Sequence, residues 1–134
     1  MEVALGTEAF IIGVEVLAGK TSARATTLTL NISSPSSTGG RIGNVTLNAP
    51  RMAPAVTYIA PLVMRPDETS LHVRVLVDRS IVEAFVGGGR GVLSVPLTHP
   101  PAAENPLWLT ATSDSGQGTV RVKGDVWEMG CGWA

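Results

Sequence analysis

The stretch from Leu71 to Gly91, LHVRVLVDRSIVEAFVGGGRG, places the strongest constraint on the fold of this chain. Apolar residues occupy every second position from Leu71 to Val77, and this period of two places them on one face of a β-strand. A polar break at residues 78–80 precedes a second β-rich run, Ile81 to Val86, which ends at three consecutive glycines. Glycine ends a strand because it has no side chain to pack and accepts positive φ. The stretch is therefore predicted to form an antiparallel hairpin.

The register of this hairpin determines which face carries Glu83, and two registers are compatible with the sequence. If residues 79 and 80 form the loop, Glu83 lies opposite Leu76 on the less apolar face, where we expect an ion pair with Arg74 across the strands. If Asp78 joins the loop, Glu83 shares a face with Val75 and needs polar partners there. A slip of one residue exchanges the two faces. We favour the first register, because a local bulge can relieve the strain of a turn without Gly or Asn.

Strand signals recur along the rest of the chain, and they predict the fold class. Further strands are expected at Glu8–Leu17, Thr26–Ile32, Arg41–Leu47, Val56–Met64, Val92–Leu97, Leu107–Thr112 and Thr119–Met129. Pro61 places its strand at the edge of a sheet or ends the strand early, because proline has no N–H for a second neighbour. Fifteen Gly and nine Pro separate these runs, and no apolar pattern of helical period persists. We therefore predict an all-β fold, an antiparallel two-sheet β-sandwich of the jelly-roll or concanavalin-like type.

Length and composition argue against several classes of protein and of binding partner. A chain of 134 residues is expected to form a single domain, 1–134, that buries roughly two-thirds of its unfolded surface. No apolar run approaches the roughly 20 residues that span a bilayer, so we predict a soluble protein without a membrane partner. Ten basic and eleven acidic residues provide no electrostatic attraction for nucleic acid. Cys131 is the single cysteine, so we expect no intrachain disulfide, no metal site and no cofactor.

Three segments of the chain resemble one known family. The run from Leu71 to Val86, followed by Gly88 and Gly89, is similar to the Leu-Arg-Val-Leu-Val-Asp-Arg-Ser-Ile-Val-Glu-x-Phe run of the C-terminal β-sandwich module of glycoside hydrolase family 32. This family contains invertases, levanases, inulinases and fructosyltransferases. Gly13–Ala18 resembles an early strand of that module and Val126–Met129 its closing strand. The resemblance extends over nearly the whole chain and implies a β-sandwich.

The resemblance also implies where catalysis takes place. In family 32 the three catalytic acids belong to an N-terminal five-bladed propeller, within Asn-Asp-Pro-Asn-Gly, Arg-Asp-Pro and Glu-Cys runs. None of these runs occurs in this chain, and the Arg65-Pro66-Asp67 order differs from the second. We therefore expect no catalytic residue here, and a catalytic propeller as partner, in cis or as a separate protein. A secreted or vacuolar location follows from the same resemblance, although Met1–Gly6 does not read as a signal peptide. Self-association as a homo-oligomer is a further expectation.

Two acidic side chains near the hairpin turn are candidates for catalysis. Asp78 and Glu83 are close in sequence, and a retaining glycosidase needs two carboxyl groups about 5 Å apart. Because both belong to one hairpin, we expect a structural motif instead, in which Asp78, Arg79 and Ser80 stabilise the turn and Glu83 is paired. Gly87–Gly91 is likewise expected to be a hairpin turn, since no helix follows to direct amides at a phosphate.

Sugar binding is the alternative function, and it requires exposed aromatic faces beside polar groups. Trp108 and Trp127 fall in predicted strands and are expected in the core, which leaves Tyr58 and Trp133 as candidate carbohydrate-binding residues. The resemblance implies a non-catalytic module that packs on a catalytic propeller and supports it. A stand-alone, lectin-like module that binds fructans or other glycans is the alternative. Asn31-Ile32-Ser33 and Asn44-Val45-Thr46 match the N-glycosylation pattern, which arises often by chance. A purely structural domain without a ligand is the third possibility.

Overall fold

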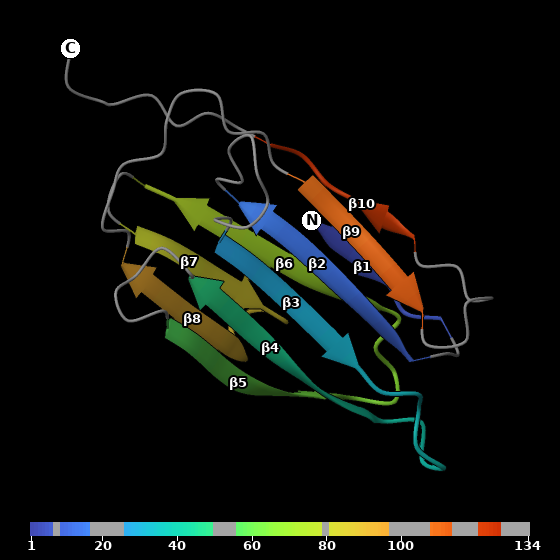
Figure 1. Ribbon diagram of the computed structural model, residues 1–134. Coiled ribbons are helices and arrows are strands. Elements are labelled where there is room, and N and C mark those ends of the chain that lie inside the picture. The colour runs from blue at the N-terminus through green and yellow to red at the C-terminus, as the bar shows by residue number, and fades with distance from the viewer. Residues whose placement is uncertain are drawn as a thin grey trace.

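The computed structural model describes residues 1–6, 9–16, 26–49, 56–78, 81–96, 108–113 and 121–126. Every regular element in these ranges is a strand (Figure 1): β1 Glu2–Ala4, β2 Phe10–Val16, β3 Thr26–Ile32, β4 Arg41–Ala49, β5 Val56–Met64, β6 Ser70–Val77, β7 Ile81–Val86, β8 Gly91–Pro96, β9 Trp108–Ser113 and β10 Val122–Lys123. Within this part of the chain there is accordingly no helix of the length and apolarity needed to cross a membrane.

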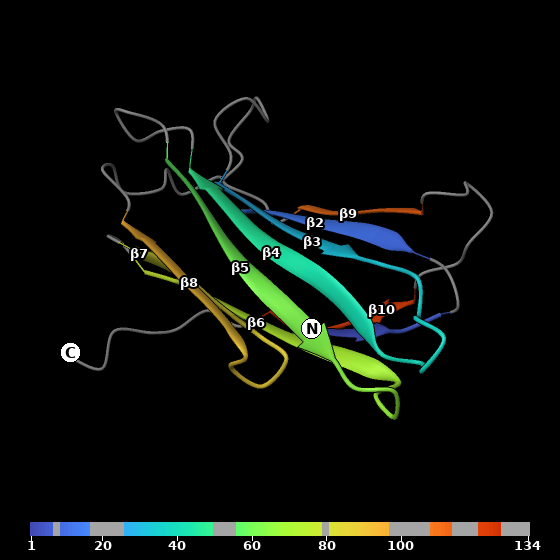
Figure 2. The same cartoon turned by 90° about the horizontal axis from the view of Figure 1, so that it is seen from below.

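The strands form two antiparallel sheets that lie one above the other (Figure 2). The first sheet has the order β10-β1-β6-β7-β8, and the second has the order β5-β4-β3-β2-β9. Each described pairing between neighbouring strands is antiparallel. This arrangement confirms the predicted all-β class and the two-sheet sandwich.

The core lies between the sheets, and β3 shows how the sequence pattern produces it. Leu28, Leu30 and Ile32 are fully buried, whereas the alternating residues Thr29 and Asn31 lie on the outer face. Because successive side chains of a strand point to opposite faces, this strict alternation buries one face and leaves the other to solvent. The same pattern in the other strands contributes the remaining core residues: Val3, Phe10, Ile12, Val14, Val45, Leu47, Ala49, Leu62, Met64, Leu71, Val73, Val82, Ala84, Val86, Leu93 and Val95.

Most predicted strands occur close to their predicted bounds. Thr26–Ile32 and Val56–Met64 agree with the prediction, and β4 continues two residues beyond the predicted end, to Ala49. Strand β1 was not predicted, because three residues are too few for a period of two to be recognised. It nevertheless lies inside the first sheet, between β10 and β6. Of the predicted Thr119–Met129 strand, the described residues contain β10 alone.

The hairpin of β6 and β7 adopts the favoured register. Leu76 is the partner of Glu83, and the backbone N–H of Asp78 donates to the carbonyl oxygen of Ile81 at 2.9 Å. Residues 79 and 80, the predicted loop, lie outside the described ranges. The first of the two registers is therefore confirmed.

The prediction of an ion pair between Glu83 and Arg74 is wrong. Arg74 is the register partner of Phe85, and the hydroxyl of Ser94 on β8 donates to the Glu83 carboxylate at 3.2 Å. Ser94 lies directly opposite Glu83 on the adjacent strand, whereas Arg74 lies diagonally across the ladder. The prediction failed because it considered the two strands of the hairpin and not the third strand beside them.

The position of Pro61 agrees with its sequence. Strand β5 is the last strand of the second sheet, and Pro61 is exposed on it opposite Asn44 of β4. The pyrrolidine nitrogen of proline carries no hydrogen. At the edge of a sheet no strand lies on the open side, so no hydrogen bond between strands is lost there. The predicted edge strand is confirmed.

Adjacent residues of β3 test the assignment of its two faces. We expect Leu30→Ala to lower the free energy of unfolding by about 2–5 kcal/mol, because it leaves a cavity between the sheets. Thr29→Ala, its neighbour on the outer face, is expected to cost less than about 1 kcal/mol. Urea unfolding followed by tryptophan fluorescence measures both values. Equal losses for the two variants would contradict the assigned faces.

Candidate functional site

The outer face of β3 and β4 presents uncharged polar side chains in facing pairs. Thr29 is the partner of Thr46, and Asn31 is the partner of Asn44. These pairs arise because both strands alternate apolar residues toward the core with Thr or Asn toward the outside. We call the pair of Asn31 and Asn44 the amide pair.

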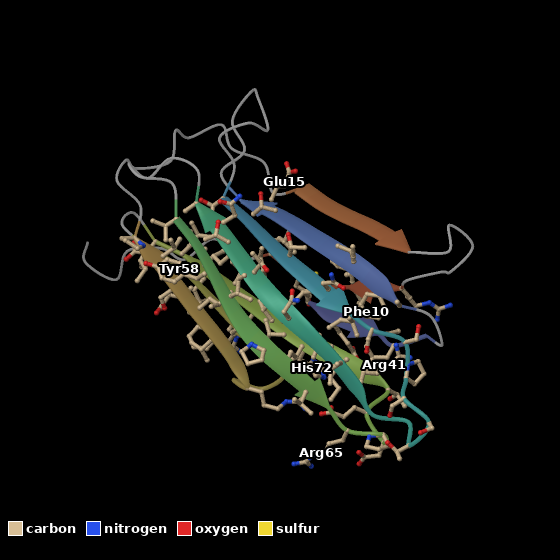
Figure 3. The ribbon with its side chains drawn as sticks, turned by 60° about the horizontal axis from the view of Figure 1, so that its bottom comes forward. Phe10, Glu15, Arg41, Tyr58, Arg65 and His72 are labelled. Carbon is tan, nitrogen blue, oxygen red and sulfur yellow. The ribbon has the colours of Figure 1, made fainter. Side chains whose placement is uncertain are left out.

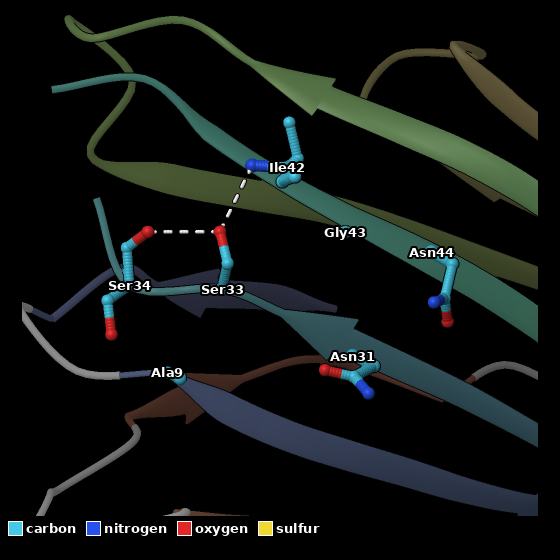
Figure 4. Close-up of a pocket in the computed structure, with 7 residues that line it drawn as sticks. All are labelled: Ala9, Asn31, Ser33, Ser34, Ile42, Gly43 and Asn44. Atoms are coloured by element: carbon cyan, nitrogen blue, oxygen red, sulfur yellow. Dashed lines mark hydrogen bonds between the residues drawn. The ribbon is translucent and has the colours of Figure 1, made fainter. Parts of the chain in front are cut away.

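An open hollow lies over this face at one end of the two strands (Figure 4). Its volume is about 440 Å³, and its lining includes the amide pair, Ser33, Ser34 and Ile42. Ala9 and Gly43 are the other described lining residues, and none of the described lining residues carries an ionisable side chain. The Ile42 side chain is 69% exposed and provides the apolar part of the surface. The described lining is thus uncharged, with amide, hydroxyl and aliphatic groups beside one another.

Hydrogen bonds hold the rim of the hollow in place. The Ser33 hydroxyl donates to the carbonyl oxygen of Ser34 at 3.0 Å and accepts from the backbone N–H of Ile42 at 3.2 Å. Arg41 lies beneath this rim, largely buried, and its guanidinium donates to the carbonyl oxygens of Ser33, at 3.0 Å, and of Gly6. Burial lowers the pKa of Arg41 from its ordinary value. The guanidinium therefore joins the start of β4 to the end of β3.

Glycine at position 43 allows the two strands to approach closely under the hollow. A Cβ at Gly43 would lie 2.3 Å from the carbonyl oxygen of Asn31 and 2.8 Å from the Ile32 side chain. A backbone carbonyl cannot move aside as a flexible side chain can, so a larger residue would push β3 and β4 apart. The spacing of the amide pair depends on this glycine.

The side chains of the amide pair have no hydrogen-bond partner within the described part of the chain. Asn31 is exposed and Asn44 is half-buried at the hollow. Asn48, farther along the same face of β4, differs because its side-chain oxygen accepts from the Thr57 hydroxyl at 3.4 Å. Each amide offers two N–H donors and one oxygen acceptor. The hollow consequently holds two amides that are able to bond to a bound molecule.

A second polar arrangement joins the two sheets at an edge. Arg90 follows Gly87–Gly89, three glycines with positive φ in the turn between β7 and β8. Its guanidinium donates to the carbonyl oxygen of Gly87 at 2.8 Å and to that of Val63, on β5 of the other sheet, at 2.9 Å. The predicted hairpin turn is confirmed, and its arginine contacts both sheets.

Glu68 completes this arrangement, which we call the arginine clamp. Its carboxylate meets Arg90 through both oxygens, at 2.7 and 2.9 Å. It also accepts from the backbone N–H of Arg65 at 2.8 Å. The hydrogen bond from Arg90 is the main cause that lowers the pKa of Glu68, and the Arg65 backbone bond adds to it. A bidentate contact between a guanidinium and a carboxylate is strong and fixes the geometry of both groups. Here it stabilises the fold beside the edges of both sheets.

The comparison with protein families agrees with this fold and with the sequence motifs. Residues 2–128 match the family described as Glycosyl hydrolases family 32 C terminal. The chain belongs to this family. The search of curated proteins and the search of solved structures each returned no match. The resemblance predicted from the hairpin is thereby confirmed over nearly the whole length of this family 32 module.

The structure does not bring Tyr58, one of the two predicted sugar-binding residues, to the hollow of the family 32 module. Tyr58 is 41% exposed and is the partner of Leu47, on the side of β5 that also carries Leu62. It lies at the other end of β4 and β5 from Arg41 and the hollow (Figure 3). Trp133 lies outside the described residues. The role of Tyr58 and Trp133 in sugar binding stays a prediction.

The predicted structural motif is described in part. Asp78 is exposed at the end of β6, and Glu83 is half-buried on β7 with Ser94 as its hydrogen-bond donor. Arg79 and Ser80 lie outside the described residues. In the described ranges, no group of three or more His, Cys, Asp or Glu side chains is placed to hold a metal ion.

The remaining histidine, tryptophan and cysteine positions are described only in part. His72 is exposed on β6. The backbone of Trp108 pairs with Glu15 at the start of β9, but its side chain is outside the described part. Trp127, His99 and Cys131 also fall outside it. Sequence reasoning missed the amide pair as a site, although it recorded both asparagines in glycosylation patterns.

The arginine clamp predicts a pH-dependent contribution to stability. The pKa of Glu68 is lowered from its ordinary value of 4.5, so the carboxylate stabilises the folded state above that pH. The contribution is lost as the pH falls through the lowered pKa. We expect Glu68→Gln to reduce the free energy of unfolding at pH 7 by at most about 1 kcal/mol, because the pair is partly exposed.

Urea unfolding at pH 7 and at pH 3 measures this difference. The wild type and Glu68→Gln should differ at pH 7 and converge at pH 3. Asp67→Asn is the matched control, since it removes the neighbouring exposed carboxylate and leaves the clamp intact. A gap between the wild type and Glu68→Gln that stays constant down to pH 3 would contradict the role of the ionised carboxylate.

Proposed function

We propose that this family 32 module is non-catalytic and that it packs on the catalytic propeller of a fructan- or sucrose-acting glycosidase. Membership in the family makes the chain a module of glycosyl hydrolases. The packing role is supported by one observation in particular, an apolar surface along strand β5. The two acidic residues of the hairpin support the non-catalytic role, because Asp78 is exposed at a strand end and Glu83 is held by Ser94.

The apolar surface consists of alternate residues on the outer face of β5, and we call it the apolar edge. Ile59 and Val63 are 66% and 65% exposed, and Pro61 between them is also exposed. Residues two apart on a strand share a face, so the three side chains form one strip. Burying large aliphatic side chains in a contact is favourable by about 25 cal/mol for each Å² removed from water.

The chemistry of this edge favours packing of side chains over pairing of strands. Strand β5 has β4 as its one neighbour among the described strands of the sheet, and on β5 the carbonyl oxygen of Val63 accepts from Arg90 instead of from a further strand. Pro61 interrupts the side of β5 away from β4, because proline offers no N–H for a ladder. A second copy of the chain could not continue the sheet across this position without losing a hydrogen bond. A folded domain that covers the side chains is the better occupant, and the family supplies a catalytic propeller as that domain.

Substitutions on β5 test the packing role. Ile59→Asp and Val63→Asp each place a charge in the apolar edge, and we expect either to weaken binding to the propeller encoded with this module at least tenfold. Thr57→Asp is the matched control, because Thr57 is an exposed residue of the same strand face outside the strip. Calorimetric titration of the separately purified domains measures the affinity. Unchanged binding by both edge variants would overturn the assignment of this surface.

The non-catalytic role has a direct test. Incubation of this chain alone with sucrose or inulin is expected to release no fructose above the blank, whereas the propeller with the chain bound is expected to release it. Reducing-sugar detection and chromatography measure the products. Hydrolysis by the chain alone that is abolished in Glu83→Gln would contradict the proposal and would place catalysis on the hairpin.

A further inference from the structure

We infer that the hollow over β3 and β4 binds a neutral oligosaccharide through the amide pair, Asn31 and Asn44. The inference goes beyond the packing role and does not depend on it. The two surfaces differ: the packing role uses the apolar edge of β5, whereas the hollow lies on the outer face of β3 and β4.

The hydrogen-bonding capacity of the hollow fits a ligand with many hydroxyl groups. Asn31 and Asn44 are partners across the β3–β4 ladder, so their Cβ atoms are expected to lie about 4.5–5.5 Å apart. Neither side-chain amide is bonded to another described residue, and each can donate to one hydroxyl while it accepts from another. Two such groups side by side can bind successive hydroxyl groups of a sugar ring.

The uncharged side chains of the described lining favour a neutral ligand over a charged one. Because no described lining residue is ionisable, a phosphate, a carboxylate or an ammonium group would lose hydration without forming an ion pair with these residues. A neutral polyol has no such penalty, since amides replace its bonds to water. The exposed side chain of Ile42 adds an aliphatic surface against which the C–H groups of a sugar ring can pack.

The size and rigidity of the hollow are also suited to a sugar. Its open volume of about 440 Å³ leaves room for a sugar ring to lie against the strand face. Its open shape allows a longer chain to continue into solvent. The backbone around it is held by Ser33 and Arg41, and the strand spacing depends on Gly43. A site that is ordered before binding loses less conformational entropy on binding.

The hollow also lies next to the apolar edge. Ile42, which lines the hollow, is the register partner of Val63, which belongs to the edge. A glycan bound at the hollow would therefore lie beside whatever domain covers β5. If the proposed packing role is correct, the module would hold a carbohydrate chain close to the catalytic propeller.

Titration of the isotope-labelled chain with defined sugars, followed by NMR, tests the inference. The probes are 1-kestose and maltotriose, which are neutral, and trigalacturonate, which is anionic. We expect at least one neutral trisaccharide to cause saturable shifts of the Asn31 and Asn44 side-chain NH₂ signals. The anionic probe is expected to cause none. The Asn31→Ala/Asn44→Ala double variant should bind about tenfold more weakly, because two hydrogen bonds of ordinary net strength are lost.

Asn48→Ala is the matched control for the double variant. It removes an amide from the same strand face, but from one that already accepts a bond from Thr57, so sugar affinity should be unchanged. Dispersed backbone amide signals show that each variant is folded. The inference is overturned if neither neutral probe shifts the two asparagine signals, if the double variant binds as the wild type does, or if trigalacturonate binds as tightly. Since the packing role is tested with the propeller and this role with sugars alone, failure of one is distinguishable from failure of the other.

Discussion

Burial of one face of each sheet against the other is the interaction on which the whole structure depends. Residues such as Leu30, Val45 and Val82 come from both sheets, and each is fully buried in a single core. An isolated sheet would leave its apolar face in water, so neither sheet is expected to be stable alone. The core assigns every strand residue to an inner or an outer face, and the outer faces then become available for other roles.

The outer surfaces of the module differ in chemistry, and the difference follows from which residues alternate with the core. Strands β3 and β4 place Thr and Asn outside, which makes a neutral, hydrogen-bonding surface with a hollow. Strand β5 places Ile59, Pro61 and Val63 outside, which makes an apolar surface at the end of the sheet. Two arginines stabilise the fold: Arg41 joins the end of β3 to the start of β4, and Arg90 joins the two sheets through the carbonyl oxygen of Val63 and is paired with Glu68.

The parts of the fold that depend on local pattern could be predicted. The hairpin of β6 and β7, its register and the edge position of Pro61 each follow from a few neighbouring residues, and the structure confirms them. Features that need a third strand could not be predicted in this way. Glu83 bonds to Ser94 rather than to Arg74 because β8 lies on the other side of β7. The site was missed for a similar reason, since Asn31 and Asn44 face one another only once the connection between β3 and β4 has set their register.

The amino-acid sequence by itself determined the fold class and the family of this protein. The period of two in apolar residues indicates strands, and the run from Leu71 to Val86 indicates the family; both are local properties of the sequence. The tertiary structure alone decided which strands are neighbours, which outer residues meet, and where a hollow remains. Those features depend on contacts between residues that are distant in sequence. A strand's own pattern specifies which of its faces is buried, and it carries no information about the strand that will lie beside it.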